Sequence, residues 1–160
     1  TDFSAWPSFL PILLVFSSFV GGCAGSTGGG LKVIRVFLLF LQGKREIDRL
    51  IHPKAVYSVK LGERAMPDRV VEAVWGFFSA YAIVFVIIMI GLIATGLDNI
   101  TAFTATAATL NNLGPGLGTV ATTYADVSDA GKWLLVTAML FGRLEVFSLL
   151  VLFSPTFWRS

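Results

Sequence analysis

The uncharged run from Ala73 to Leu97 constrains the fold of this chain more than any other feature. The run lies between Glu72 and Asp98 and is dense in Val, Ile, Phe and Leu. About 20 apolar residues cross the hydrocarbon core of a bilayer as a helix, so this run predicts a transmembrane helix with length to spare for tilt. The chain as a whole is 14% charged, against about a quarter in soluble proteins. The alternative, a buried helix of a soluble protein, is therefore disfavoured.

The basic residues are concentrated in one polar stretch. Nine of the twelve Lys and Arg lie between Lys32 and Arg69, with apolar segments on both sides. By the positive-inside rule, residues 44–70 are expected to form a cytoplasmic link. Acidic residues are mixed into this stretch and it is too short for a separate domain, so nucleic-acid binding is not expected. The lone Cys23 provides no disulfide framework. Without an initiator Met or a signal peptide, the chain is expected to be part of a longer protein.

The first apolar stretch, residues 1–43, is interrupted by a glycine loop at residues 21–30. Six of the ten residues in the loop are Gly, which disfavours a stable helix. Because no charge occurs between Asp2 and Lys32, we expect the loop to lie at membrane depth. Irregular backbone is tolerated there only when protein buries it or it lines an aqueous cavity. The pattern therefore predicts a broken transmembrane helix with an intramembrane loop.

The uncharged stretch after the 73–97 span is not another span. Residues 100–110 are rich in Ala and Thr and make about three helical turns, after which the Gly and Pro of residues 111–116 end the helix. A half-length helix and a loop between two spans, 73–97 and 133–158, predict a re-entrant pore loop. A polar extracellular loop with a short surface helix remains the alternative. Residues 71–160 are thus predicted to form one helix–pore loop–helix repeat of an all-α membrane protein.

The loop that follows the predicted pore helix has the composition of an ion filter. A dehydrated cation needs backbone carbonyls to replace its water shell, and the carbonyls of Asn111, Asn112, Leu113 and Gly114 can provide them. Gly114 gives access to backbone conformations closed to other residues. The negative end of the preceding helix dipole would face the ion.

Two charged residues lie within the predicted last span. Arg143 and Glu145 are expected near the bilayer midplane, where a charge costs about 2.5–3.5 kcal/mol on insertion scales and needs a partner or water. They are two residues apart and cannot easily pair with each other. Arg143 is a candidate barrier to cations, because a fixed positive charge on a cation pathway repels them, and Glu145 is a candidate tie between helices. A buried structural tie is the alternative for Arg143.

Other kinds of site are not supported by the sequence. The glycine loop resembles a phosphate-binding loop superficially, but Leu31 separates the last Gly from Lys32, and Val33 replaces the required Ser or Thr. There is also no Cys/His metal cluster and no Ser-His-Asp arrangement. We therefore expect neither an enzyme nor an organic cofactor in this chain.

A resemblance to a known family covers the whole chain. Two motifs carry it, the segment from Gly21 to Lys32 and the segment from Leu110 to Gly116. Both resemble motifs of the TrkH/TrkG/KtrB superfamily of microbial potassium uptake proteins, most closely its bacterial TrkH branch. The family has four helix–pore loop–helix repeats around one pore. The chain resembles the second helix of repeat three followed by repeat four.

The resemblance implies roles for the residues already singled out. Asn111, Asn112, Leu113 and Gly114 would form a quarter of a K⁺ filter, K⁺ being the transported ion, and Arg143 would lie beneath that filter. The gate would consist of Arg143 and the glycine loop, with its residues Gly21, Gly22, Gly25, Ser26, Thr27, Gly28, Gly29 and Gly30. The family also implies a homodimer in the bacterial inner membrane, surrounded by lipid, with a cytoplasmic C-terminus. A TrkA-like cytoplasmic ring would carry the regulatory nucleotide.

Two other functions remain open from the residues alone. A broken-helix secondary transporter, such as a cation-coupled symporter, would use the glycine loop and the filter-like loop to hold substrate and coupling ion. A non-conducting scaffold would need neither the loop at 111–116 nor Arg143. A channel needs four filter loops around one axis, whereas a symporter needs paired inverted repeats, so the sequence upstream of Thr1 would separate them.

Overall fold

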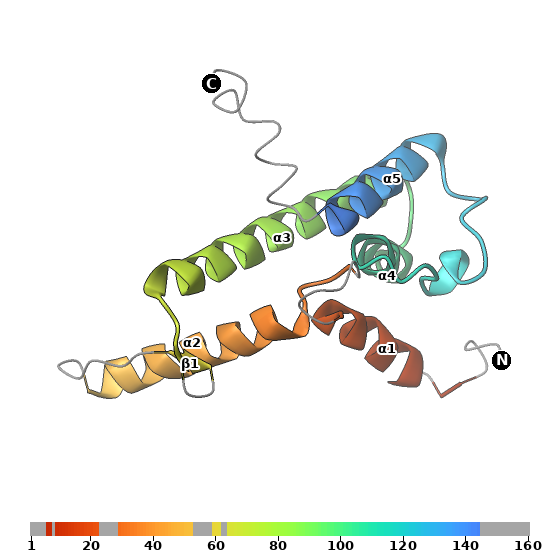
Figure 1. The fold of residues 1–160 in the computed structure, drawn as a ribbon. Coiled ribbons are helices and arrows are strands. Elements are labelled where there is room, and N and C mark those ends of the chain that lie inside the picture. The colour runs from red at the N-terminus through yellow and green to blue at the C-terminus, as the bar shows by residue number, and fades with distance from the viewer. Residues whose placement is uncertain (1–5, 8, 23–28, 53–58, 62–63, 145–160) are drawn as a thin grey trace, which may run out of the picture.

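The computed structural model describes residues 6–7, 9–22, 29–52, 59–61 and 64–144, and this part of the chain is mainly helical (Figure 1). The elements are α1 (Phe9–Val20), α2 (Val33–Ile51), α3 (Asp68–Ala94), α4 (Asn99–Leu110), the 3-10 turn η2 (Gly118–Val120) and α5 (Asp129–Arg143). A two-stranded antiparallel hairpin, β1 (Lys60–Leu61) and β2 (Arg64–Ala65), follows α2.

The long helix α3 connects the two halves of the structure. It packs against α2 in one half and against α4 and α5 in the other (Figure 1). The short helix α4 contacts α1, α3 and α5. The candidate pore helix thus lies against three other helices, whereas α1 and α2 flank a break in the chain.

Small side chains allow this close packing around α4. Ala102, Ala105, Ala107 and Ala108 have no exposed surface. The threonines of the helix satisfy their hydroxyls locally: for example, Thr106 donates to the carbonyl of Ala102 at 2.7 Å. A buried helix with its polar groups satisfied internally can lie in an apolar environment without a desolvation penalty from unpaired donors.

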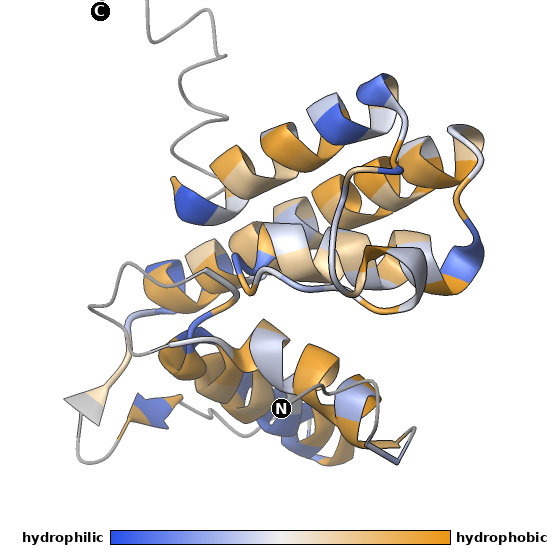
Figure 2. Cartoon of the chain, turned by 90° about the vertical axis from the view of Figure 1, so that its right-hand side faces the viewer, coloured by the Kyte–Doolittle hydropathy of each residue, from blue (hydrophilic) through white to orange (hydrophobic). Residues whose placement is uncertain are grey.

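The outer surface of the structure is unusually apolar. Along α3, Ile83, Ile87 and Ile90 are each about 60% exposed, and Phe9 on α1 is 68% exposed. Figure 2 shows hydrophobic residues along the outer faces of these helices. Within the described residues, α3 alone is long and apolar enough to cross a membrane, and α1 is a shorter apolar helix. Faces of this kind are normally covered by lipid or by other protein.

Some element boundaries differ from the sequence-based expectations. The helix expected at 73–97 runs from Asp68 to Ala94, and the helix expected from residue 133 begins at Asp129, because Ser128 caps it by accepting from the N–H of Gly131. The short hairpin of β1 and β2 was not expected. Residues 145–160, the rest of the 133–158 span, lie outside the described residues.

The helix α2 extends well into the segment expected to be a link. It continues to Ile51, so residues 44–51 of the 44–70 segment are helical. Two side-chain contacts stabilise this extension: Gln42 Nε2 donates to Glu46 Oε1 at 2.9 Å within the helix, and Arg45 Nη1 lies 2.7 Å from Asp68 Oδ1 at the start of α3. The longer helix is thus tied to α3 rather than isolated.

Candidate filter loop and helix break

The loop after α4 begins as a helix cap. Asn112 has φ +53, the left-handed conformation, and its N–H donates to the carbonyl of Thr109 at 3.1 Å. The N–H of Leu113 donates to the carbonyl of Ala108 at 2.8 Å. These two bonds and the left-handed residue define a Schellman motif, in which Asn is the usual substitute for Gly. The motif turns the chain sharply from α4 into the loop that follows it.

Gly114 also has a conformation that other residues avoid. Its φ is +109, and a Cβ added there would meet nothing within 4 Å. The requirement for Gly is therefore conformational rather than steric, as the sequence predicted. The carbonyl of Gly114 accepts a hydrogen bond from the Tyr124 hydroxyl at 2.8 Å. Burial raises the pKa of Tyr124, so its phenol stays protonated and able to donate.

The side chain of Asn111 is held by two other helices. Its Oδ1 accepts from the Tyr81 hydroxyl of α3 at 2.5 Å, and its Nδ2 donates to Ser18 Oγ of α1 at 2.8 Å. Asn111 is only 6% exposed and Tyr81 only 4%. A buried amide with both of its ends bonded has a fixed position, so the start of the loop is anchored to both α1 and α3.

Two glycines let other segments come close to the same point. A Cβ added at Gly142 of α5 would overlap the carbonyl oxygen of Leu110 and lie 2.6 Å from Asn112 Nδ2. A Cβ added at Gly29 would overlap the backbone carbonyl of Asn111. The end of α4 is thus in direct backbone contact with α5 and with the segment that precedes α2.

The break between α1 and α2 is bridged by backbone hydrogen bonds. The N–H of Leu31 donates to the carbonyl of Phe19 at 3.0 Å, and the N–H of Val33 donates to the carbonyl of Gly22 at 3.2 Å. Gly21 and Gly30 have φ +68 and +85, respectively. The chain is therefore non-helical at both ends of the predicted glycine loop. The candidate gate residues Gly25, Ser26, Thr27 and Gly28 lie outside the described residues.

The two charged candidates of the last span are placed differently. Arg143 is the last residue of α5, exposed, and directly follows Gly142. The structure therefore brings its backbone close to the end of α4. Glu145 lies outside the described residues. Another cation, Arg35 of α2, lies over the ring of Phe77 of α3, with Cζ 4.2 Å from the ring centre.

The N-terminal end of α4 has its own anchor. Asp98 is the N-cap of α4, and its carboxylate accepts from the N–H of Thr101 at 3.1 Å. Hydrogen bonds from the hydroxyl and the N–H of Thr101 hold the pKa of Asp98 below its usual value. The carboxylate is therefore charged at neutral pH, which suits the positive end of the helix dipole.

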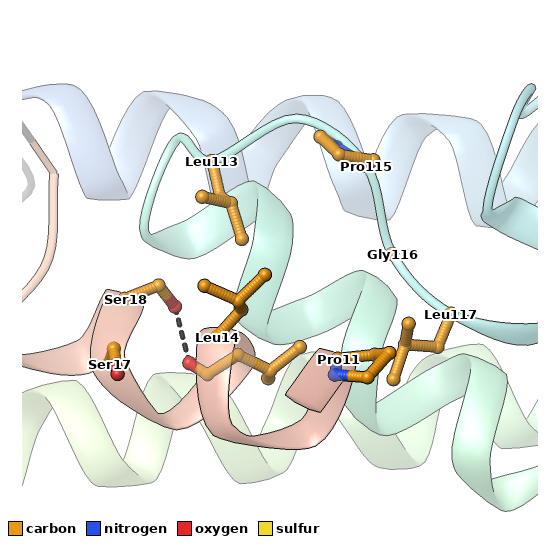
Figure 3. Close-up of a pocket in the computed structure, with 9 residues that line it drawn as sticks. Pro11, Leu14, Ser17, Ser18, Leu113, Pro115, Gly116 and Leu117 are labelled. Carbon is orange, nitrogen blue, oxygen red and sulfur yellow. Dashed lines mark hydrogen bonds between the residues drawn. The ribbon is translucent and has the colours of Figure 1, made fainter. Parts of the chain in front are cut away.

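An apolar cavity of about 400 Å³ separates α1 from the loop. Figure 3 shows Leu113 and Pro115 of the loop on one side of it and Leu14 and Ser18 of α1 on the other. Among the described residues, no group of three or more His, Cys, Asp or Glu could hold a metal ion.

Comparison with known proteins assigns the chain to a family. The family model described as TrkH, cation transport protein, matches residues 1–160. The chain belongs to the TrkH family. The family is one of transport proteins, not of enzymes, and its members are membrane proteins with helix–pore loop–helix repeats, which is the fold class that the sequence predicted.

Similar relatives cover the chain almost completely. It is 68% identical over 160 residues to the Trk system potassium uptake protein TrkH of Vibrio parahaemolyticus and 66% identical over 155 residues to TrkH of Escherichia coli. These matches cover 100% and 97% of the chain but only 33% and 32% of the relatives. The crystal structure of the potassium transporter TrkH from V. parahaemolyticus superposes with a TM-score of 0.90, over 99% of this chain and 34% of that one. The chain thus spans about a third of the length of these TrkH proteins.

Sequence reasoning missed the residues that hold the loop in place. The Ser18–Asn111 and Tyr81–Asn111 contacts join residues 93 and 30 positions apart, and no local pattern indicates such pairs. Gly142 was likewise not singled out, because a single Gly in an apolar helix has no distinctive signature. The left-handed Asn112 had a usable signal, since Asn just after a helix end is a common cap.

Proposed function

We propose that the chain is the second helix of repeat three together with repeat four of a potassium uptake protein. In it, Asn111, Asn112, Leu113 and Gly114 form a quarter of a K⁺ filter. The observation that carries this proposal is the short buried helix α4 ending in a Schellman turn, with positive φ at Asn112 and Gly114. A membership in a cation transport family and relatives named for potassium uptake support the same function.

The filter would act through its backbone. Four such loops around one axis would present rings of carbonyls that replace the hydration shell of K⁺. The dipole of α4 would place partial negative charge at its C-terminal end, next to the ion. Asn111, Tyr81 and Tyr124 would contribute by fixing the loop, because a carbonyl ring discriminates between ions only when its oxygens hold their positions.

We further propose that the helix break and Arg143 form the gate beneath the filter. Gly29 lies against the backbone of Asn111, and the backbone of Arg143 follows Gly142 at the end of α4. Both are therefore neighbours of the filter. The cytoplasmic side would carry residues 44–70 and the C-terminus, and a TrkA-like ring with bound nucleotide would act on the gate. A homodimer in the bacterial inner membrane, surrounded by lipid, completes the proposal.

The filter assignment is tested by replacing Gly114 in the full-length protein. Gly114→Ala forces a side chain onto a φ of +109 and should turn a carbonyl out of the ring, so that uptake loses its preference for K⁺ over Na⁺. Gly96→Ala is the matched control, because Gly96 has φ +97, equally open space and a position in the α3–α4 turn. Ion uptake is measured in cells lacking other potassium systems. Unchanged selectivity of Gly114→Ala would exclude the filter.

A further inference from the structure

A chain of hydrogen bonds runs from α3 through the first filter residue to α1. The Tyr81 hydroxyl donates to Asn111 Oδ1 at 2.5 Å, and Asn111 Nδ2 donates to Ser18 Oγ at 2.8 Å. The Ser18 hydroxyl donates in turn to the carbonyl of Val15 at 2.6 Å, a bond visible in Figure 3. Because the Ser18 hydroxyl donates its hydrogen to the Val15 carbonyl, its oxygen can act only as an acceptor toward the Asn111 amide. The orientation of the Asn111 amide is thus determined by its neighbours.

This chain lies in a buried environment, which makes it costly to disturb. Tyr81 and Asn111 are 4% and 6% exposed, and the rings of Phe19 and Phe77 pack around Tyr81 at centroid distances of 6.4 and 6.3 Å. A buried polar atom that loses its partner costs more than the net gain from one hydrogen bond. The amide is therefore held firmly as long as both partners stay in place.

One partner belongs to the element that ends at the helix break. Ser18 lies in the last turn of α1, which ends at Val20, and Gly21 follows with φ +68. On the other side of the break, Gly29 lies against the backbone carbonyl of Asn111. Asn111 thus contacts both sides of the break, through its side chain and through its main chain. A shift of the end of α1 cannot leave the first filter residue unaffected.

We propose that Tyr81, Asn111 and Ser18 are positioning residues that couple the helix break to the filter. Ion selectivity then depends on the position in space of the C-terminal end of α1. The inference rests on the proposed filter function and adds a connection between two of its parts. It implies that removing the hydroxyl of Tyr81 or of Ser18 lowers selectivity, although neither residue contributes a carbonyl to the proposed filter.

The test uses the full-length protein in proteoliposomes, with Tyr81→Phe, Ser18→Ala and the double variant. The ratio of Na⁺ to K⁺ permeability is taken from the zero-current potential. We expect each single variant to raise this ratio about two- to tenfold, the range that corresponds to one hydrogen bond. The double variant should raise it by less than the product of the two, since both changes free the same amide.

Two further variants of α1 act as controls. Ser17→Ala removes a neighbouring exposed hydroxyl that donates only within α1, to the carbonyl of Leu13 at 2.8 Å, and should leave the ratio unchanged. Ser18→Thr keeps the hydroxyl and should restore selectivity. Multiplicative effects of the two single variants, or equal behaviour of Ser17→Ala and Ser18→Ala, would overturn the coupling.

A second measurement separates this inference from the proposed function. Thermal unfolding of the same proteins in detergent reports the hydrogen-bond chain without any transport. The double variant should lower Tm by less than the sum of the two single variants. If the wild type shows no preference for K⁺, the filter proposal fails, whatever the unfolding result. If wild-type selectivity is normal but the effects on Tm add, the chain through Asn111 does not exist as a unit.

Discussion

The glycines of this chain meet different structural requirements that the residue type alone does not reveal. Gly114 needs its φ of +109, whereas Gly142 is needed because a Cβ would overlap the carbonyl oxygen of Leu110. Gly43 in α2 has neither requirement, since nothing lies within 4 Å of an added Cβ. Replacing Gly by Ala is therefore expected to have a different outcome at each of these three positions.

Gly142→Ala should destabilise the protein by separating α5 from the end of α4. The overlapping atom is a backbone carbonyl, which cannot rotate away as a flexible side chain does, and overpacking of this kind costs about 1–3 kcal/mol. Gly43→Ala is the control and should stabilise α2 by up to about 1 kcal/mol, the difference in helix propensity. Thermal unfolding of both full-length variants checks the expectation. Equal Tm values would contradict the close approach of α5 to the end of α4.

The hydroxyl of Tyr124 should matter for the outer part of the filter. It donates to the Gly114 carbonyl at 2.8 Å, and Tyr124→Phe removes this donor while keeping the ring. We expect a loss of K⁺ preference of about two- to tenfold, the range for one hydrogen bond. Thr137→Val is a control, because the Thr137 hydroxyl donates only within α5. Uptake of K⁺ and Na⁺ measures both; wild-type selectivity in Tyr124→Phe would show that the Gly114 carbonyl needs no support.

At the scale of single residues, the sequence predicted the unusual backbone conformation at Gly114 but not the hydrogen bonds that hold the loop in place. Gly114 followed by Pro115 indicates a turn with restricted φ, and the structure confirms the positive φ of Gly114. The partners of Asn111 come from α1 and α3, far away in the sequence. Such pairs depend on tertiary packing, which neither periodicity nor propensity encodes.

Among the elements, α2 changes the interpretation of the basic segment. Docking of the proposed regulatory ring could use three cations of this helix, Lys44, Arg45 and Arg49. The structure shows Lys44 and Arg49 exposed, but the Arg45 guanidinium pairs with Asp68 at 2.7 Å and its side chain is only 16% exposed. Arg45 thus ties α2 to α3, and Lys44 and Arg49 remain candidates for docking.

The two roles predict different consequences of charge reversal. Arg45→Glu should lower the stability of the full-length protein by about 1 kcal/mol or less, since Asp68 is largely exposed, and Asp68→Arg in the same chain should restore it. Reversing Lys44 and Arg49 together should leave Tm unchanged and weaken co-purification of the regulatory ring. Unfolding and pull-down assays on the same variants measure both effects. Wild-type binding by the Lys44 and Arg49 double variant would place docking elsewhere.

The types of most elements followed from the sequence, and their ends did not. The span beginning near residue 73, the short helix at 100–110 and the interruption after Val20 were all expected, because apolar length and Gly content are strong local signals. The extension of α2 to Ile51 was missed, since it depends on the tie to Asp68 in another helix. The hairpin of β1 and β2 is too short to have a clear pattern.

For the whole molecule, the exposed apolar faces and the greater length of the relatives both indicate that this part of the protein is packed against lipid or further repeats. The chain spans about a third of the TrkH relatives, and α1 exposes Phe9, Ile12 and Phe16 by about half or more. Apolar faces of this extent need lipid or further repeats against them. Function therefore has to be tested in the full-length protein, where the proposed filter of four loops and the proposed gate could form.

Arg143 and the helix break should act together as the gate of that whole protein. We propose that the guanidinium of Arg143, at the end of α5, adds positive charge near the proposed filter and so repels K⁺, and that its planar donors suit the carbonyls of a non-helical segment. In the closed state each would satisfy the other, and opening would require the break to move aside. Because Gly29 lies against Asn111, such a movement would also uncover the backbone of the first filter residue.

Arg143→Ala, or a deletion within residues 21–30, should therefore raise K⁺ flux and make it less dependent on the regulatory ring and its nucleotide. Removing the fixed charge should increase flux by about tenfold, which corresponds to about 1.4 kcal/mol of barrier. Lys132→Ala is the matched control, since Lys132 is a cation of the same helix that pairs with Asp129 at 3.6 Å, far from the filter loop along α5. Liposome flux with and without partner and nucleotide distinguishes the outcomes. If Arg143→Ala and the deletion conduct less than the wild type yet unfold at the wild-type temperature, the gate assignment is wrong. Arg143 and the glycine loop are then structural parts of the pore, because removing a gate should not lower the ion flux.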